Sequence, residues 1–363
     1  MGDRVISAVL EEVGRFSIRE FDLPEIGQNE ALLRVEMAGV CRTDASFYHG
    51  KTRRHLIPLI LGHEILGRIA GVGRAAARDW GVREGDRVVV ESSIRCGHCR
   101  YCMSGAYQLC DNRRAYGTSV TLAVPPHLWG AYGQYLYVAP GSVLHKISES
   151  VPGEAAVLAC SVVADGIQWV RHMGGVRIGD VVVIQGSGQQ GLAATVAARE
   201  SGAGLIAVTG LARDQQRFEL ARTLGADLTI DIEKEDATER LLGETGGQLA
   251  DVVLDVSGSP RALPEAASLV RKGGTIVAAS VVGQETLIAL PSDQLLFKQI
   301  TVKFVYTSTA PAVRAAVRLI ESRKYPFEQM VTHRFALEQA ELAVKTVAGE
   351  NPKAYPTKVV LIP

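Results

Sequence analysis

The chain has 363 residues, of which 47% are hydrophobic and 21% charged, and its 39 basic residues balance 39 acidic ones. A chain of this length exceeds the usual size of one hydrophobic core, so we expect two domains. Zero net charge excludes a charge field directed at nucleic acid or at a membrane surface. The charged, alternating N-terminal segment is unlike a signal peptide, and no uninterrupted apolar run is long enough to cross a bilayer. We therefore expect a cytoplasmic protein.

The order of predicted elements gives the domain plan. Up to about Val143, β-branched runs such as ALLRVEMAGV and DRVVVESSI, separated by glycine-rich turns, predict short strands. From about Pro152, buried strands such as GDVVVIQG alternate with helices such as QQGLAATVAARESGA. This alternation predicts a parallel, doubly wound sheet. We predict an α/β fold in which residues 1–156 and 306–363 form a β-rich domain and residues 157–305 form an inserted dinucleotide-binding domain.

Four of the six cysteines lie in the segment CGHCRYCMSGAYQLC, as Cys96, Cys99, Cys102 and Cys110. In a reducing cytosol, clustered thiols are more typical of metal ligands than of disulfides. Four thiolates can close a tetrahedral shell around zinc and leave no position open for chemistry. We predict a structural zinc in a lobe of about residues 92–114, with an iron–sulfur cluster or unligated thiols as the alternatives.

A glycine motif follows the first predicted strand of the inserted domain. Gly186, Gly188 and Gly191 stand between that strand and the start of a helix. In this context the first glycine permits a tight turn, the second lets a pyrophosphate approach the backbone, and the third allows close packing of helix and strand. The helix N-terminus then faces the phosphates. The motif predicts a dinucleotide site.

The choice between NAD and NADP stays open. Thr209 and Gly210 stand where a carboxylate would bind the ribose of NAD. Arg213 and Arg217 follow, and a guanidinium there could accept the 2′-phosphate of NADP, although a solvated helix surface explains both arginines equally well. Asp214 keeps NAD open, and we lean slightly towards NADP.

A second metal site is indicated by the segments GVCRTD and LGHEILG, which contain Cys41 and His63. Cys160 is the one remaining cysteine outside the lobe. Two cysteines and one histidine are the ligand set of an open zinc, with the fourth position free for water or substrate. A histidine beside a glutamate, here Glu64, can also be a plain surface pair.

These motifs, in this order and over essentially the whole chain, resemble the zinc-dependent medium-chain alcohol dehydrogenases. The resemblance implies a GroES-like catalytic domain built from both chain ends and an inserted Rossmann domain. It implies reversible hydride transfer between an alcohol and NAD or NADP, with one catalytic and one structural zinc in each subunit. Members are dimers or tetramers, so a homodimer or homotetramer is expected.

The resemblance also implies residue roles. Cys41, His63 and Cys160 would bind the catalytic zinc, and Glu64 would bind it transiently. Asp44 would orient His63, and Thr43 would take the proton of the substrate. Ser46 stands where a histidine often ends the proton relay. The expected cofactor contacts are Arg42, Gly186, Gly188, Gln189, Gln190, Gly191, Thr209, Arg213, Ser280 and Lys358, and for Lys358 an exposed strand-end lysine is the alternative.

The substrate is the least determined part. An aromatic set suits a secondary or cyclic alcohol, although such residues are also ordinary core: Phe47, Tyr48, Trp129, Tyr132 and Phe304. A zinc hydrolase or lyase would leave the glycine motif unexplained, and a non-catalytic cofactor-binding protein on the same fold is the other alternative.

Overall fold

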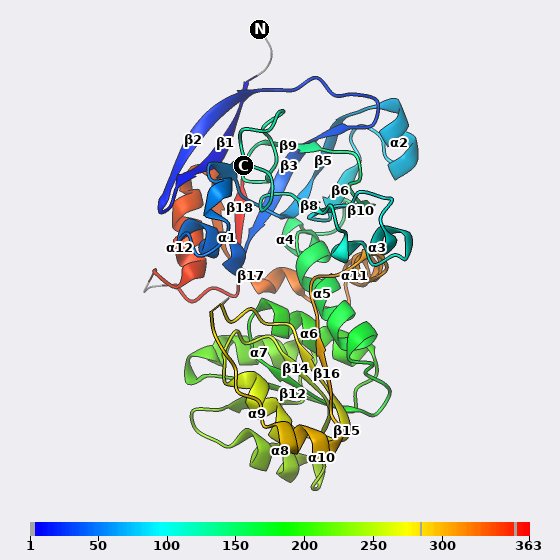
Figure 1. Cartoon of the computed structure of the whole chain (residues 1–363), viewed down its shortest axis with the longest axis vertical. Coiled ribbons are helices and arrows are strands. Elements are labelled where there is room, and N and C mark those ends of the chain that lie inside the picture. The colour runs from blue at the N-terminus through cyan, green and yellow to red at the C-terminus, as the bar shows by residue number, and fades with distance from the viewer. Residues whose placement is uncertain (1–3, 284, 352–353) are drawn as a thin grey trace. The chain divides into compact units, whose positions relative to one another are not determined.

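The computed structural model describes residues 4–283, 285–351 and 354–363. The chain forms two compact units, one of residues 1–161 with 309–363 and one of residues 162–308 (Figure 1). The expected boundaries at residues 156 and 305 lie a few residues before these limits.

The first unit is built mainly from strands. A seven-stranded sheet has the order β10-β6-β5-β3-β18-β17, with β9 also paired to β3, and a smaller sheet has the order β2-β1-β4. Its strands are β1 (Arg4–Glu12), β2 (Arg15–Asp22), β3 (Ala31–Val40), β4 (Leu59–Ile60), β5 (Glu64–Val72), β6 (Arg87–Val90), β7 (Ser93–Ile94), β8 (Arg114–Ala115), β9 (Tyr135–Val138), β10 (Leu144–Lys146), β17 (Val331–Ala336) and β18 (Lys358–Ile362). Its helices are α1 (Arg42–Tyr48), α2 (Arg74–Trp80), α3 (Arg100–Met103), α4 (Gly153–Ala156), α11 (Ala310–Glu321) and α12 (Ala340–Ala348).

The two ends of the chain belong to one unit because strand β18 completes the sheet. It pairs antiparallel with β3 and parallel with β17. Val359, Val360 and Leu361 are fully buried, so this last strand supplies side chains to the core as well as backbone hydrogen bonds.

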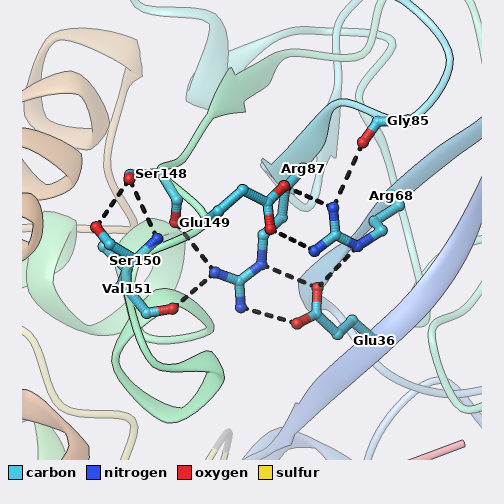
Figure 2. A network of polar contacts seen from close by, with 8 residues as sticks. All are labelled: Glu36, Arg68, Gly85, Arg87, Ser148, Glu149, Ser150 and Val151. Atoms are coloured by element: carbon cyan, nitrogen blue, oxygen red, sulfur yellow. Dashed lines mark hydrogen bonds and ion pairs between the residues drawn. The ribbon is translucent and has the colours of Figure 1, made fainter.

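A buried arginine ties the sheet to the loop that follows β10 (Figure 2). Arg87 makes two hydrogen bonds to Glu36, at 2.9 and 2.8 Å, and donates to the carbonyl oxygens of Ser148 at 3.1 Å and Val151 at 2.7 Å. The contact with the carboxylate is bidentate, a geometry that the planar guanidinium favours. Arg68 adds a more exposed pair with Glu149. The network fixes the path of the chain towards α4.

The second unit contains a six-stranded sheet of order β13-β12-β11-β14-β15-β16, in which all neighbouring strands are parallel. The strands are β11 (Val181–Gln185), β12 (Leu205–Gly210), β13 (Leu228–Asp231), β14 (Ala250–Asp255), β15 (Val270–Ala278) and β16 (Thr301–Phe304), and the helices are α5 (Ala164–Ile167), α6 (Gln189–Glu200), α7 (Gln215–Thr223), α8 (Ala237–Thr245), α9 (Ala262–Leu269) and α10 (Ser292–Lys298). All five residues of β11 are buried, as expected for a strand covered on both faces. The predicted doubly wound α/β fold is confirmed.

One segment departs from the expectation that no apolar run could cross a bilayer. The helical segment Gly153–Met173 is long and apolar enough by length and composition. However, 78% of its most apolar window is buried inside the protein, which is typical of a core helix.

Candidate functional site

Three side chains of the first unit form a possible metal-binding cluster. The ligand atoms of Cys41, Asp44 and His63 all lie within 4.8 Å of one another. The sulfur of Cys41 lies 3.0 Å from Nε2 of His63, and Oδ1 of Asp44 lies 3.4 Å from Nδ1 on the other side of the ring. The imidazole therefore stands between a thiol and a carboxylate.

Two neighbouring strands place these residues. Cys41 directly follows β3, and His63 directly precedes β5. Because β3 and β5 are antiparallel, with Gly39 opposite Glu64, the end of one strand lies beside the start of the other. Cys41 also caps helix α1: its sulfur accepts from the backbone of Thr43 at 3.2 Å, and its own N–H donates to Asp44 at 2.8 Å. The motif GVCRTD thus encodes a helix cap and two members of the cluster together.

The charges of the cluster favour a cation at Nε2. Burial lowers the pKa of His63, but the negative charges of Cys41 and Asp44 outweigh it and raise this pKa well above its ordinary value. Burial acts to raise the pKa of Asp44, yet the charge of His63 and hydrogen bonds from His63, the Cys41 backbone and Tyr132 leave that pKa lowered. A thiolate and an imidazole whose Nδ1 faces a carboxylate suit zinc.

Glu64 and Lys358 pair with each other outside this cluster. Their side chains are 2% and 0% exposed, and the ammonium of Lys358 contacts the Glu64 carboxylate and donates to the carbonyl oxygen of Val40 at 3.3 Å. Lys358 is therefore not an exposed strand-end lysine, and its contact with the cofactor pyrophosphate stays a prediction. The partners are 294 positions apart in the sequence, which explains why sequence patterns did not suggest the pair.

The other expected residues of this site lie in different settings. Cys160 is buried in a π-helical turn, Ala159–Val163, and its sulfur does not belong to the cluster of three. Thr43 and Arg42 are exposed in the first turn of α1. Ser46 is half-buried, and its hydroxyl donates to the carbonyl oxygen of Arg42 at 3.1 Å.

The aromatic set proposed for the substrate is largely core. Phe47, Tyr48, Trp129 and Tyr132 are all buried within the hydrophobic core of the first unit. Phe304 is 72% exposed and belongs to the second unit. Four of the five therefore use their rings for packing, and a role for this set at the substrate stays a prediction. Sequence reasoning also missed that Tyr132 helps to lower the pKa of Asp44.

The four cysteines of the lobe form the second cluster. The sulfurs of Cys96, Cys99, Cys102 and Cys110 lie within 4.8 Å of one another. Hydrogen bonds from the backbones of His98 and Cys99 are the main causes that lower the pKa of Cys96 to about 6, whereas burial raises the pKa of Cys102 to about 12. Crowded thiols lose their first proton easily and resist losing the last until a cation balances the charge. This donor set fits a closed zinc site.

The glycine motif of the second unit has the form of a phosphate-binding loop. Gly186 follows β11, and Gly188 precedes helix α6. A Cβ at Gly191 would lie 1.8 Å from the carbonyl oxygen of Gly186, whereas a Cβ at Gly188 would meet nothing within 4 Å. The loop is thus closely packed at Gly191 and leaves open space at Gly188. Gln185, Ser187 and Gln189 each carry a buried side-chain oxygen with no hydrogen-bond partner among the described residues, which fits a polar ligand. Gln190 follows in the first turn of α6.

Residues near the ends of β12 and β15 complete this region. Thr209 is buried, and its carbonyl oxygen accepts from the N–H of Gly186 at 3.1 Å. The hydroxyl of Ser280 donates to Asp255 at 3.1 Å and accepts from the N–H of Gly258 at 2.9 Å. Arg213 is exposed in a short 3₁₀ turn, Ala212–Asp214, just beyond β12.

Comparisons with known proteins agree with this geometry. Residues 27–149 match the family model of the alcohol dehydrogenase GroES-like domain, and residues 191–322 match that of the zinc-binding dehydrogenase. A Mycobacterium tuberculosis protein named "Probable alcohol dehydrogenase" is 38% identical over 368 residues, covering 100% of this chain and 99% of that protein.

Solved structures give the same result. The alcohol dehydrogenase of Thermotoga maritima has a TM-score of 0.90 at 29% identity and covers 100% of both chains. A Sinorhizobium meliloti structure described as a zinc-binding dehydrogenase bound to NADP has a TM-score of 0.88 at 27% identity, with 99% of this chain and 100% of that chain covered. This chain belongs to the zinc-dependent alcohol dehydrogenase family of the medium-chain dehydrogenases.

Proposed function

We propose that the protein is an NADP-preferring zinc alcohol dehydrogenase that transfers hydride reversibly between an alcohol and the nicotinamide. The observation that carries the proposal is the cluster in which His63 stands between the Cys41 sulfur and the Asp44 carboxylate. Cys41, His63 and Cys160 would hold the catalytic zinc, and the four lobe cysteines the structural one. When bound, the catalytic zinc supplies Lewis acidity and NADP supplies the hydride acceptor.

The residues of the chain prepare this chemistry. Asp44 faces Nδ1 of His63, which keeps the proton on that nitrogen and leaves Nε2 to bind metal. The Thr43 N–H donates to the Cys41 sulfur and so helps to hold that sulfur in place beside His63. The Thr43 side chain is exposed beside Cys41, and we assign its hydroxyl the substrate proton. Lys358 neutralises Glu64 and keeps its carboxylate within the core.

The proposed preference for NADP is supported by the contacts and exposure of the residues that follow β12. Oδ2 of Asp214 accepts from the N–H of Leu211 at 2.9 Å, and its Oδ1 pairs with Arg217 at 3.0 Å, so this carboxylate is committed within the fold. A Cβ at Gly210 would lie 2.9 Å from Asp214 and 2.9 Å from the ring of Phe218, which leaves no room for an acid there. Arg213 is exposed and would bind the 2′-phosphate.

We also propose a homodimer. Strand β16 ends the order of the parallel sheet, so one of its edges has no partner among the described strands. Apolar side chains lie exposed on and beside it: Leu296 at 67%, Phe297 at 76%, Phe304 at 72% and Tyr306 at 56%. An apolar edge of this kind favours pairing with a second copy. Light scattering of wild type and Phe304→Glu tests this: a monomeric wild type contradicts it, and dissociation of the variant supports it.

The cysteine chemistry supports a cytoplasmic location. All six cysteines are free of disulfides, as expected in a reducing compartment.

The reaction is tested by following the absorbance of reduced nicotinamide. Purified protein is incubated with NADP or NAD and a panel of primary, secondary and cyclic alcohols, and with NADPH or NADH and the matching carbonyl compounds. We expect turnover with a secondary or cyclic alcohol, faster with NADP, and two zinc ions in each subunit. No oxidation or reduction with any pair would contradict the proposal.

A further inference from the structure

A buried carboxylate lies at the carboxyl end of strand β14. Asp255 is the last residue of this strand and is 2% exposed. Its Oδ1 accepts three hydrogen bonds, from the N–H of Ser257 at 2.9 Å, from the hydroxyl of Ser257 at 2.8 Å and from the hydroxyl of Ser280 at 3.1 Å. Burial of a carboxylate is costly unless hydrogen bonds replace the lost water, so these donors explain how the charge is held there.

Each of the two hydroxyls that donate to Asp255 also accepts a hydrogen bond from the backbone. The Ser280 hydroxyl accepts from the N–H of Gly258 at 2.9 Å, and the Ser257 hydroxyl accepts from the N–H of Ser259 at 3.0 Å. Because a hydroxyl has a single proton, the carboxylate determines where both protons point and leaves the oxygen lone pairs to the backbone. The carboxylate therefore shapes the loop after β14 and joins it to the segment after β15.

The loop after β14 also packs against the glycine motif. Gln185, the last residue of β11, is paired with Asp255, and its carbonyl oxygen accepts from the N–H of Val256 at 3.0 Å. A Cβ at Gly186, whose φ is +114°, would lie 2.9 Å from the Cα of Ser257. Because the two backbones approach so closely, a shift of the loop after β14 would displace the tight turn of the phosphate-binding segment.

The order of the strands indicates which part of a dinucleotide would lie here. The order β13-β12-β11-β14-β15-β16 reverses between β11 and β14, and in such sheets a dinucleotide lies across the carboxyl ends of the strands at that point. The glycine motif and Arg213 belong to the half formed by β11 to β13, which would hold the adenosine part. The ends of β14 and β15, where Asp255 and Ser280 lie, then belong to the nicotinamide half.

We propose that Asp255 is a positioning residue of the nicotinamide half of the cofactor site. Its carboxylate holds the loop after β14 and the segment after β15 in the form that accepts the cofactor. The inference rests on the proposed function, since it assumes that the glycine motif binds NADP or NAD. A carboxylate needed only for the stability of the sheet would support both halves of the site equally, whereas the hydrogen bonds to Asp255 come from one half.

The test measures cofactor binding to the purified, zinc-loaded protein without substrate. The dinucleotide is NADPH or NADH, whichever the wild type binds more tightly, and its fluorescence reports binding. The fragment is the matching adenosine 2′,5′-bisphosphate or AMP, and calorimetry measures its binding. For Asp255→Ala we expect the Kd of the dinucleotide to rise by about tenfold and that of the fragment by less than about twofold, because the lost hydrogen bonds order the nicotinamide half. Asp255→Asn keeps an oxygen acceptor and should restore most of the affinity for the dinucleotide.

Asp251→Ala is the matched control. Asp251 lies near the other end of β14 and also joins neighbouring strands: its Oδ2 accepts from the Val181 N–H at 2.8 Å, and its Oδ1 accepts from the Arg271 guanidinium at 2.5 Å. Because this carboxylate lies near the amino end of the strand, away from the glycine motif, its removal should leave the ratio of the two Kd values unchanged, even where it lowers the free energy of unfolding.

Three results would overturn the proposal: equal rises of the two Kd values in Asp255→Ala, an unchanged Kd of the dinucleotide in that variant, or the same selective loss in Asp251→Ala. Should Asp255→Ala not fold, Ser257→Ala takes its place. We expect about threefold weaker binding of the dinucleotide in Ser257→Ala with the fragment unchanged, because one of the hydrogen-bonding hydroxyls is lost; unchanged binding of the dinucleotide contradicts the proposal. If the wild type binds neither dinucleotide, the proposed function fails instead.

Discussion

The two metal-binding clusters of this chain are organised in opposite ways. The lobe gathers its four sulfurs between Cys96 and Cys110, in a segment with only short elements such as α3. The other cluster takes Cys41 and His63, 22 residues apart, from two neighbouring strands of the largest sheet. A lobe of this kind depends on its metal for its shape, whereas the sheet places Cys41 and His63 before any metal binds. The four predictions below test this difference, from the largest expected effect to the smallest.

Replacing His63 should remove chemistry and leave the fold intact. For His63→Gln we expect kcat/KM to fall by about 10³-fold or more, because the open zinc is no longer held beside the substrate. The zinc content should fall to the lobe ion alone, with little change in the melting temperature. Steady-state kinetics and metal analysis check this, with His127→Gln as the control, since that imidazole contacts the Leu122 carbonyl oxygen and the Phe21 ring and belongs to neither metal cluster. Retained activity in His63→Gln would refute the assigned site.

Replacing a lobe cysteine should have the reverse effect. Cys99→Ser breaks the closed shell, and we expect the free energy of unfolding to fall by about 3 kcal/mol or more, while kcat of the protein that remains folded changes less than about threefold. Denaturant unfolding with parallel kinetics measures both. Met103→Ala, which truncates a side chain 76% exposed in the same lobe, should change neither. A large loss of kcat at unchanged stability would show that the lobe takes part in chemistry.

The sheet's own framework can be weakened without touching either cluster. Arg87→Met removes the two hydrogen bonds to Glu36 and leaves the carbonyl oxygens of Ser148 and Val151 without this donor. We therefore expect the free energy of unfolding to fall by about 2–3 kcal/mol. Arg68→Met breaks a pair whose side chains are 41% and 64% exposed and should cost less than about 1 kcal/mol. Urea unfolding of both variants decides this. Equal losses of unfolding free energy in the two variants would mean that the burial of Arg87 does not strengthen its contacts.

The smallest expected effect concerns cofactor choice in the second unit. Arg213→Ala should lower the kcat/KM ratio of NADP over NAD by about tenfold, because the 2′-phosphate loses its cation. Arg222→Ala is the control, since that guanidinium donates to Thr229 at 2.6 Å on the far end of α7. An unchanged ratio in Arg213→Ala would leave the NADP preference without its proposed cause.

Local patterns in the sequence predicted much of this protein. The alternation of strands and helices predicted the parallel sheet, and the spacing of four cysteines predicted a cluster that the structure shows as four neighbouring sulfurs. The segment GVCRTD predicted Cys41 and Asp44 as parts of one site, since a helix cap brings residues three apart into contact. These features depend on contacts between near neighbours in the chain, which a linear pattern can express.

Tertiary structure alone decided the contacts between distant residues. Lys358 pairs with Glu64, because β18 lies next to β3 and so brings Lys358 beside the start of β5. Tyr132 lies in the core beside the segment before His63, because its backbone N–H donates to the carbonyl oxygen of Leu61. Such contacts depend on which strands become neighbours, and that is set by packing of the whole core, which no short stretch of sequence contains.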